Sequence, residues 1–216
     1  MADFDGVLST GMTGHLSAWQ IPAKPTGLKK VLVKLFWDAW DQFEDEVHYT
    51  LDLSAFLLGA DDKARNATDL IFFGELAHES DSVTMVENNL IYIDCKKIPE
   101  DIEKIRFAVT IHDDLDEEIV FGTLHNARVK IIDIGGVPEK VLEDCEAHPE
   151  RYKVLMKSPA AKVYANIDLA DGFPDSVTAE AGELFKTGGI WKVRTAARAF
   201  DGDLAALCEK HGIKVE

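Results

Sequence analysis

The sequence is poor in cysteine and contains no long apolar run. Its 216 residues include 3 cysteines, Cys95, Cys145 and Cys208, which are widely spaced. They match neither the ligand spacing of a zinc site nor a disulfide framework, so we expect a reducing, cytoplasmic environment. No segment approaches the ~18 consecutive apolar residues of a membrane helix. The opening residues, MADFDGVLST, lack the basic and apolar regions of a signal peptide. We therefore predict no membrane span.

Positive charge is scarce as well. Lysine and arginine total 23 against 39 aspartates and glutamates, which leaves a formal net charge of −16. Binding to nucleic acid depends on cationic side chains that displace counterions from phosphates. We therefore exclude a nucleic-acid partner. The same charge suits a divalent cation as ligand, or it serves only to keep the protein soluble.

The sequence also lacks the motifs that mark common catalytic sites. It contains no G-x-S-x-G, no phosphate-binding loop, no H-E-x-x-H and no C-x-x-C. Because no nucleophile and base stand at a diagnostic spacing, we predict that the protein is not an enzyme. The glycine pairs Gly135–Gly136 and Gly188–Gly189 predict turns between strands, where a positive φ favours glycine.

Short runs rich in β-branched and aromatic residues dominate the rest of the chain. Turn residues separate them at short intervals, which is typical of an antiparallel sandwich or barrel rather than of alternating strands and helices. The expected strands are 30–36, 48–58, 70–73, 90–94, 104–112, 127–134, 163–169, 182–185 and 190–196.

Two segments show a helical pattern instead. Pro138–Lys157 carries apolar residues at helical spacing, and we expect Pro149 to divide it into two pieces. Leu204–Lys210 predicts a short helix that ends at Gly212. The chain shows no internal repeat and no change of composition that would mark a boundary, so we predict a single domain over 1–216.

The excess carboxylates gather in segments that we expect to be loops. They lie within 38–46, 61–62, 79–87 and 113–118. Calcium takes about 6–8 oxygen ligands, which loops at one end of a sandwich can supply. The composition by itself favours the alternative that these are solvated acidic loops, because no EF-hand spacing appears.

Two histidines flank one of these acidic segments. His112 and His125 stand on either side of Asp113–Glu118 and could approach each other across a hairpin. A histidine pair with nearby carboxylates can bind a transition metal. Without a third ligand at a diagnostic spacing, ordinary histidines at strand ends are the favoured interpretation.

Several of the strand runs, taken in order, resemble a known family. They are LKKVLVKLFWD (28–38), LDLSAFLL (51–58), DLIFF (69–73), IPEDIEKIRFAVTIH (98–112), FGTLHNARV (121–129) and the run 183–193. Together they resemble the TerD domain of tellurium-resistance and bacterial stress proteins. The word LSTG (8–11) is similar to the family's opening, which makes 1–28 a leader strand. The resemblance implies an all-β fold, an antiparallel β-sandwich of two sheets, with calcium bound by carboxylates on loops.

The resemblance also implies which residues would bind calcium in this chain. Carried over position by position, the ligands are Asp52, Asp81, Glu87 and Asn88. The family's first acid is replaced by Thr50, and its glycine- and aspartate-rich loop is missing after Asn89. So few oxygens are insufficient for a closed calcium cage. We therefore expect the calcium site to be weakened or lost.

The segment 135–162 is a helical insertion relative to the family pattern. Such a helix either covers an exposed sheet of its own chain or presents an apolar stripe to a partner. The resemblance implies a non-enzymatic stress-response protein that acts as a binding or scaffolding module. The alternative is a structural or assembly protein, including one encoded by a phage or plasmid. It would use the sandwich to contact a protein partner or itself without metal.

Overall fold

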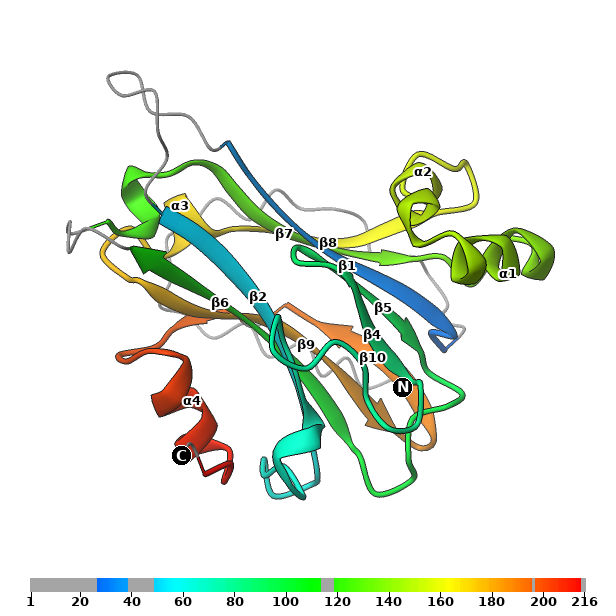
Figure 1. Ribbon diagram of the computed structural model, residues 1–216, viewed down its shortest axis with the longest axis horizontal. Coiled ribbons are helices and arrows are strands. Elements are labelled where there is room, and N and C mark those ends of the chain that lie inside the picture. Colours follow the sequence, from blue (N-terminus) through cyan, green and yellow to red (C-terminus); the bar gives the residue numbers. More distant parts are fainter. Residues whose placement is uncertain (1–26, 39–48, 114–118, 196, 215–216) are drawn as a thin grey trace, which may run out of the picture.

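The computed structural model describes residues 27–38, 49–113, 119–195 and 197–214. Two antiparallel sheets stack on each other, as the strand pattern predicts (Figure 1). The five-stranded sheet has the order β4-β5-β1-β7-β8 and the six-stranded sheet the order β10-β9-β6-β2-β3, with β11 beside β9. The strands of the first sheet are β1 (Lys30–Asp38), β4 (Val83–Glu87), β5 (Leu90–Asp94), β7 (His125–Asp133) and β8 (Lys162–Asp168). Those of the second are β2 (Tyr49–Leu58), β3 (Leu70–Ile71), β6 (Lys104–Asp113), β9 (Thr178–Thr187), β10 (Ile190–Arg194) and β11 (Arg198–Ala199).

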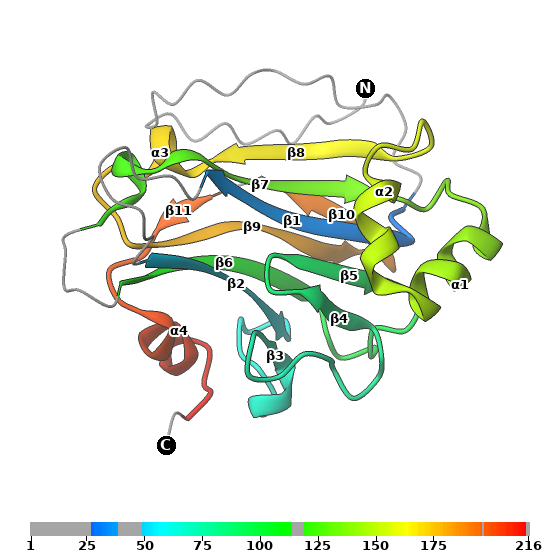
Figure 2. The ribbon, with the colours of Figure 1, turned by 45° about the horizontal axis from the view of Figure 1, so that its top comes forward.

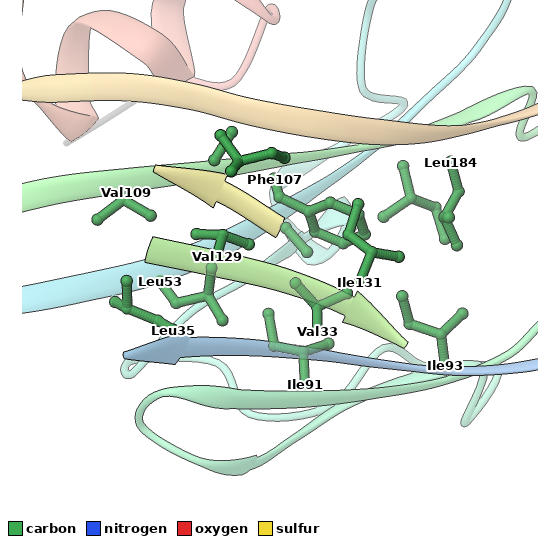
Figure 3. Packing of buried hydrophobic residues seen from close by; sticks show 14 of the residues in the cluster. Val33, Leu35, Leu53, Ile91, Ile93, Phe107, Val109, Val129, Ile131 and Leu184 are labelled. Atoms are coloured by element: carbon green, nitrogen blue, oxygen red, sulfur yellow. The ribbon is translucent and has the colours of Figure 1, made fainter. Parts of the chain in front are cut away.

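Alternation along the strands builds the main core between the sheets. In β1, Val31, Val33 and Leu35 are fully buried and belong to this core. Figure 3 shows aliphatic side chains of β1, β5 and β7 lying opposite Leu53, Phe107 and other residues of the second sheet. Burying each large apolar side chain stabilises the fold by roughly 1.5–3 kcal/mol. The period-2 pattern thus determines which face of each strand is buried.

The helical insertion covers the outer face of the five-stranded sheet. It contains α1 (Glu139–Ala147), the 3-10 turn η3 (Pro149–Arg151) and α2 (Tyr152–Leu155), which lie beside β1 and β5 (Figure 2). The predicted break at Pro149 is confirmed. A second core joins the insertion to the sheet and consists of Leu32, Leu90, Tyr92, Ile132, Ile134, Val137, Leu142, Cys145, Tyr152 and Leu155. The apolar side of the insertion therefore packs on its own sheet.

A C-terminal helix, α4 (Leu204–Lys210), covers part of the outer face of the six-stranded sheet, with the predicted bounds (Figures 1 and 2). The Asp203 carboxylate accepts a hydrogen bond from the backbone N–H of Ala206 at 2.9 Å and caps the helix. Gly212, at φ +83°, follows its end. The third apolar cluster lies under α4 and consists of Phe56, Leu58, Leu70, Ala108, Leu207, Cys208 and Ile213.

The structure differs from the sequence-based prediction in several segments. The segment 79–87 is not loop throughout, because β4 begins at Val83. The predicted strand 70–73 is shorter and comprises only β3. The strand β9 begins at Thr178, four residues earlier than predicted. Residues 169–172 form a short helix, α3 (Leu169–Gly172), and the 3-10 turns η1 (Ala67–Asp69) and η2 (Phe121–Thr123) were not expected. Both glycine pairs lie in turns, as predicted. Gly188 and Gly189 also have the predicted positive φ, whereas Gly135 and Gly136 do not.

His112 and His125 do not approach each other across a hairpin. β6 pairs with β2 and β9, whereas β7 pairs with β1 and β8, so the chain crosses from one sheet to the other between them. His112 lies opposite Thr50, and His125 lies opposite Asp38. The two histidines therefore belong to different sheets.

Three sequence-based expectations concern the chain ends, the thiols and membrane helices. Most of the predicted leader strand 1–28 lies outside the described residues, which begin at Gly27. Cys95, Cys145 and Cys208 are buried free thiols. No helix within the described ranges has the length and apolar character needed to cross a membrane.

Candidate functional site

Asp52 lies on the outer face of the six-stranded sheet. Its neighbours in β2, Leu51 and Leu53, point into the main core, so the side chain of Asp52 points the other way. It is half-buried, and it pairs across the sheet with Thr110. Burial raises the pKa of the Asp52 carboxyl, and the nearby His112 offsets this only in part. The Asp52 carboxylate is therefore partly shielded from solvent.

Glu87 and Asn88 lie at the turn between β4 and β5, on the other sheet. The Glu87 carboxylate forms ion pairs with Lys153 at 2.8 Å and with Lys34 at 3.5 Å. Lys34 alternates with the core residues Val33 and Leu35, so these pairs lie on the outer face of the five-stranded sheet. Asn88 is exposed beside Glu87.

Asp81 lies before the start of β4, at the other end of this strand from Glu87. Its φ is +53°, and its backbone N–H donates to the carbonyl oxygen of His78 at 2.8 Å. The four residues implied as calcium ligands are thus not brought together, because the main core separates Asp52 from Glu87 and Asn88. They do not fit a single calcium ion. Within the described ranges, no group of three or more His, Cys, Asp or Glu side chains is arranged to hold a metal ion.

Asp52 instead lines a hollow of about 250 Å³, which we call the acidic hollow. It lies between the outer face of β2 and β6, the segment after β3 and the N-terminal end of α4. Its lining residues are Asp52, Phe73, Thr110, Ile111, His112, Asp203, Leu204 and Ala205. The sequence pointed separately to Asp52 and to His112. It carried no signal for Phe73 or Asp203, which reach the hollow only through the fold.

A buried polar network fixes the segment before β4. The fully buried Asp69 carboxylate is 2.5 Å from a guanidinium nitrogen of Arg65 and 3.1 Å from Nε2 of His78. Burial raises the pKa of Asp69, but the hydrogen bonds from Arg65 and His78 outweigh this and lower it. The Nδ1 atom of His78 lies 2.7 Å from Oγ of Ser80.

This network has the residue types of a serine–histidine–aspartate relay, yet its contacts are those of a structural anchor. Arg65 binds the Asp69 carboxylate, and the same guanidinium nitrogen lies 3.1 Å from Nε2 of His78. The hydroxyl of Ser80 also bonds Ser82 at 2.8 Å, and Ser80 does not line the acidic hollow. A nucleophile needs a space for substrate beside it. We therefore assign this network to folding.

A second hollow, of about 90 Å³, lies on the same outer face as the acidic hollow, over β6, β9 and β10. We call it the arginine cavity. Its lining residues are Arg106, Glu180, Gly182, Glu183, Arg194 and Arg198. Two of the guanidinium nitrogens of Arg106 lie 3.2 and 2.8 Å from the Glu183 carboxylate. Arg198 and Lys210 bind the carboxylate of Glu180, which is 2% exposed.

A β-bulge creates the arginine cavity. Arg106 pairs with Glu183 and Ala108 pairs with Glu180, so β9 carries one extra residue in this interval. The extra residue lets both glutamates point outward, although a regular strand would place residues 180 and 183 on opposite faces. Gly182 has φ +101°, and a Cβ there would approach the carbonyl oxygen of Arg194 to 3.1 Å. The glycine inside a strand pattern was the one sequence signal for this bulge.

Comparisons with known proteins agree with this architecture. The TerD domain family matches residues 17–143. The uncharacterized Bacillus subtilis protein YceE is 31% identical over 88% of this chain and 91% of its own. The tellurium resistance protein TerD of Serratia marcescens is 29% identical over 86% of this chain and 88% of its own. General stress protein 16U of Bacillus subtilis is also 29% identical, over 88% of this chain and 90% of its own.

A solved structure shows the same fold. The crystal structure of a telluride resistance protein (TerD) homologue from Streptomyces coelicolor superposes with a TM-score of 0.60 and 18% identity. The match covers 84% of this chain and 95% of the other. At this level of identity the likeness concerns the fold alone.

Proposed function

This chain belongs to the TerD domain family, and from that premise we propose that it acts as a non-enzymatic binding module in a tellurite or general stress response. Relatives named for tellurium resistance and general stress support this role. We place the protein in the cytoplasm, which its three buried free thiols support.

The acidic hollow is the observation that carries the binding role. Two carboxylates, Asp52 and Asp203, line it together with His112 and the aromatic ring of Phe73, which is 57% exposed. Carboxylates beside an exposed aromatic face suit a cationic group, because the ring's negative face and the acids attract it together. The net charge of −16 draws cationic partners from a distance. We therefore propose that the hollow takes a lysine or arginine side chain of a protein partner.

This proposed module works without a calcium ion held by Asp52, Asp81, Glu87 and Asn88. The main core separates Asp52 from Glu87, and Glu87 is already neutralised by Lys153 and Lys34. A calcium ion would have to displace both lysines and would still lack Asp52. The proposed site accordingly binds a side chain rather than a metal.

Tolerance to tellurite tests the proposed function. Expressed in a tellurite-sensitive bacterial host, the wild-type protein should raise the tolerated concentration, and Asp52→Asn and Phe73→Ala should abolish the gain. Leu76→Ala is the control for Phe73, because Leu76 is similarly exposed nearby but does not line the hollow. Asp175→Asn is the charge control, since Asp175 is an exposed acid elsewhere. Full tolerance in the hollow variants would contradict the site, and no gain with wild type would contradict the stress role.

The alternative role, an assembly protein without metal, has one observation in its favour. Phe73 and Leu76 expose apolar surface close together in sequence, and such surface often forms contacts. The inserted helix no longer supports it, since its apolar side is occupied by the chain's own sheet. Sedimentation over a wide range of concentration decides: a compact monomer throughout would contradict self-assembly.

A further inference from the structure

The arginine cavity concentrates positive charge on an acidic protein. Among the described residues, Arg106, Arg194, Arg198 and Lys210 surround two carboxylates, Glu180 and Glu183. Arg106 also contacts Asp62, which is itself paired with Lys104 at 2.7 Å. The cluster therefore keeps a surplus of positive charge, although the chain as a whole carries −16.

Buried glutamates hold the arginines in place. Glu183 binds Arg106 at 2.8 Å from one side and Arg194 at 2.5 Å from the other, and Glu180 binds Arg198. Arg194 also stacks on the ring of Phe185, with 4.3 Å between its guanidinium carbon and the ring centre. Guanidinium groups fixed in this way lose little conformational entropy when a ligand binds.

The outer arginines, Arg194 and Arg198, retain donors that are not bonded to these glutamates. Among the described residues, the hydrogen bonds to glutamate occupy Nη1 of Arg194 and Nε of Arg198. A guanidinium carries five N–H donors, so both side chains keep several for a ligand. Both are about half-exposed at the rim of the cavity, whereas Arg106 is buried at its base. An entering anion therefore meets donors without having to displace the glutamates.

From this geometry we propose that the arginine cavity binds a small free oxyanion of the phosphate class, a function beyond the one proposed above. Guanidinium forks match the oxygens of phosphate, and charge-assisted hydrogen bonds of this kind are the strong ones. The volume of about 90 Å³ suits an inorganic ion rather than a larger organic phosphate. The acidic hollow is lined by different residues, so either site can fail without the other.

Titration with inorganic phosphate, followed by calorimetry and by broadening of the phosphorus NMR line, tests this proposal. The wild type should bind one phosphate saturably, and Arg194→Gln and Arg198→Gln should each weaken the affinity at least tenfold. Arg198→Lys should recover only part of it, because lysine keeps the charge but loses the fork. Arg151→Gln is the matched control: Arg151 is a half-exposed arginine paired with Asp144 on the other sheet's helical cover, and its loss should leave the affinity unchanged.

Three outcomes would overturn the proposal. One is the absence of saturable phosphate binding by a wild type whose thermal unfolding shows it to be folded. Another is equal weakening in the Arg151→Gln control, which would indicate unspecific attraction. The third is O-phosphoserine binding as tightly as phosphate, which would contradict a cavity sized for a free ion. Because Arg194 and Arg198 are half-exposed, we expect their variants to unfold within a few degrees of wild type.

Discussion

At Glu180, burial and charge act in opposite directions on one carboxyl group. Burial raises the pKa of Glu180, but the donors around it, His211, Arg198 and Lys210, outweigh this and hold the pKa far below its usual range. The Nε2 atom of His211 lies 3.5 Å from this carboxylate but forms no hydrogen bond among the described residues, so Arg198 and Lys210 make the direct contacts. The folded state consequently keeps Glu180 ionised at pH values where the unfolded chain takes up a proton.

The stability of the fold should therefore fall on acidification. Because the pKa of Glu180 is depressed in the folded state, its contribution is present above its ordinary value of 4.5 and is lost as the pH falls below it. Glu180→Gln should cost on the order of 3 kcal/mol at pH 7, because it removes the charge of a buried carboxylate that binds both Arg198 and Lys210. It should also flatten the decline in unfolding free energy below roughly pH 5, because Glu180 no longer takes up a proton there. Urea unfolding at several pH values measures both effects.

Glu209→Gln is the control for this experiment, because Glu209 is an exposed glutamate on the same helix, α4. It should leave the free energy of unfolding within about 0.5 kcal/mol of wild type. An unchanged acid decline in Glu180→Gln would show that other carboxylates, such as Asp69 with its lowered pKa, account for the loss.

Asp52 gives a second prediction at the scale of a residue. Because Glu87 and Asn88 lie across the core from it, Asp52→Ala should not change the response of chelator-stripped protein to calcium. Calorimetry with magnesium as the reference ion measures this. Calcium-selective binding at micromolar affinity that disappears in Asp52→Ala would instead show that the ligands do gather around Asp52.

Among the elements, the helical insertion buries its apolar side chains against the five-stranded sheet. The rings of Tyr152 in α2 and Tyr92 in β5 lie 5.0 Å apart, and both side chains are buried in the second core. Val154, two residues along α2, is 67% exposed. The stripe faces the sheet and the solvent side carries the exposed residues, as expected for an amphipathic helix.

Truncating the buried side of the insertion should destabilise the protein far more than truncating its exposed side. Tyr152→Ala removes a fully buried ring and should cost about 3 kcal/mol of unfolding free energy. Val154→Ala should change it by less than about 0.5 kcal/mol. Chemical denaturation of both variants tests this. Equal effects would mean that the insertion does not depend on the sheet beneath it.

Over the whole molecule, the net charge of −16 opposes compactness. The negative charges repel one another more strongly in the folded state than in the expanded chain. The ion pairs around Glu180 and Glu183 are buried on the carboxylate side, and buried pairs are screened by salt much less than exposed ones. Added salt should consequently weaken the repulsion between the negative charges more than it weakens these ion pairs.

We expect the thermal unfolding midpoint to rise as sodium chloride increases from roughly 0.02 M to roughly 0.3 M, where the screening length falls below about 10 Å. Scanning calorimetry or circular dichroism measures the midpoint, and sodium sulfate at equal ionic strength separates screening from binding of an oxyanion. A midpoint that falls steadily with salt would indicate that attractive surface pairs outweigh the repulsion.

Local pattern was sufficient for much of the fold. Alternation along β1, β2 and β6, the break at Pro149 and the bounds of α4 were predictable because each depends on neighbouring residues. Among the candidate site residues, the sequence indicated Asp52 and His112, which do line one hollow. Charge and the unpaired cysteines also follow from composition alone. These features need no knowledge of which strand lies beside which.

Only the tertiary structure decided how distant residues combine. The sequence allowed His112 and His125 to meet across a hairpin, but β6 and β7 belong to different sheets, and Asp52 and Glu87 are separated for the same reason. The arginine cavity depends on one extra residue near Gly182 and on Arg106 meeting Glu183, 77 positions away. A shift of one residue in strand register reverses the face of every following side chain. Sheet partners and register are long-range properties, and a single sequence carries them only through the packing of the whole chain.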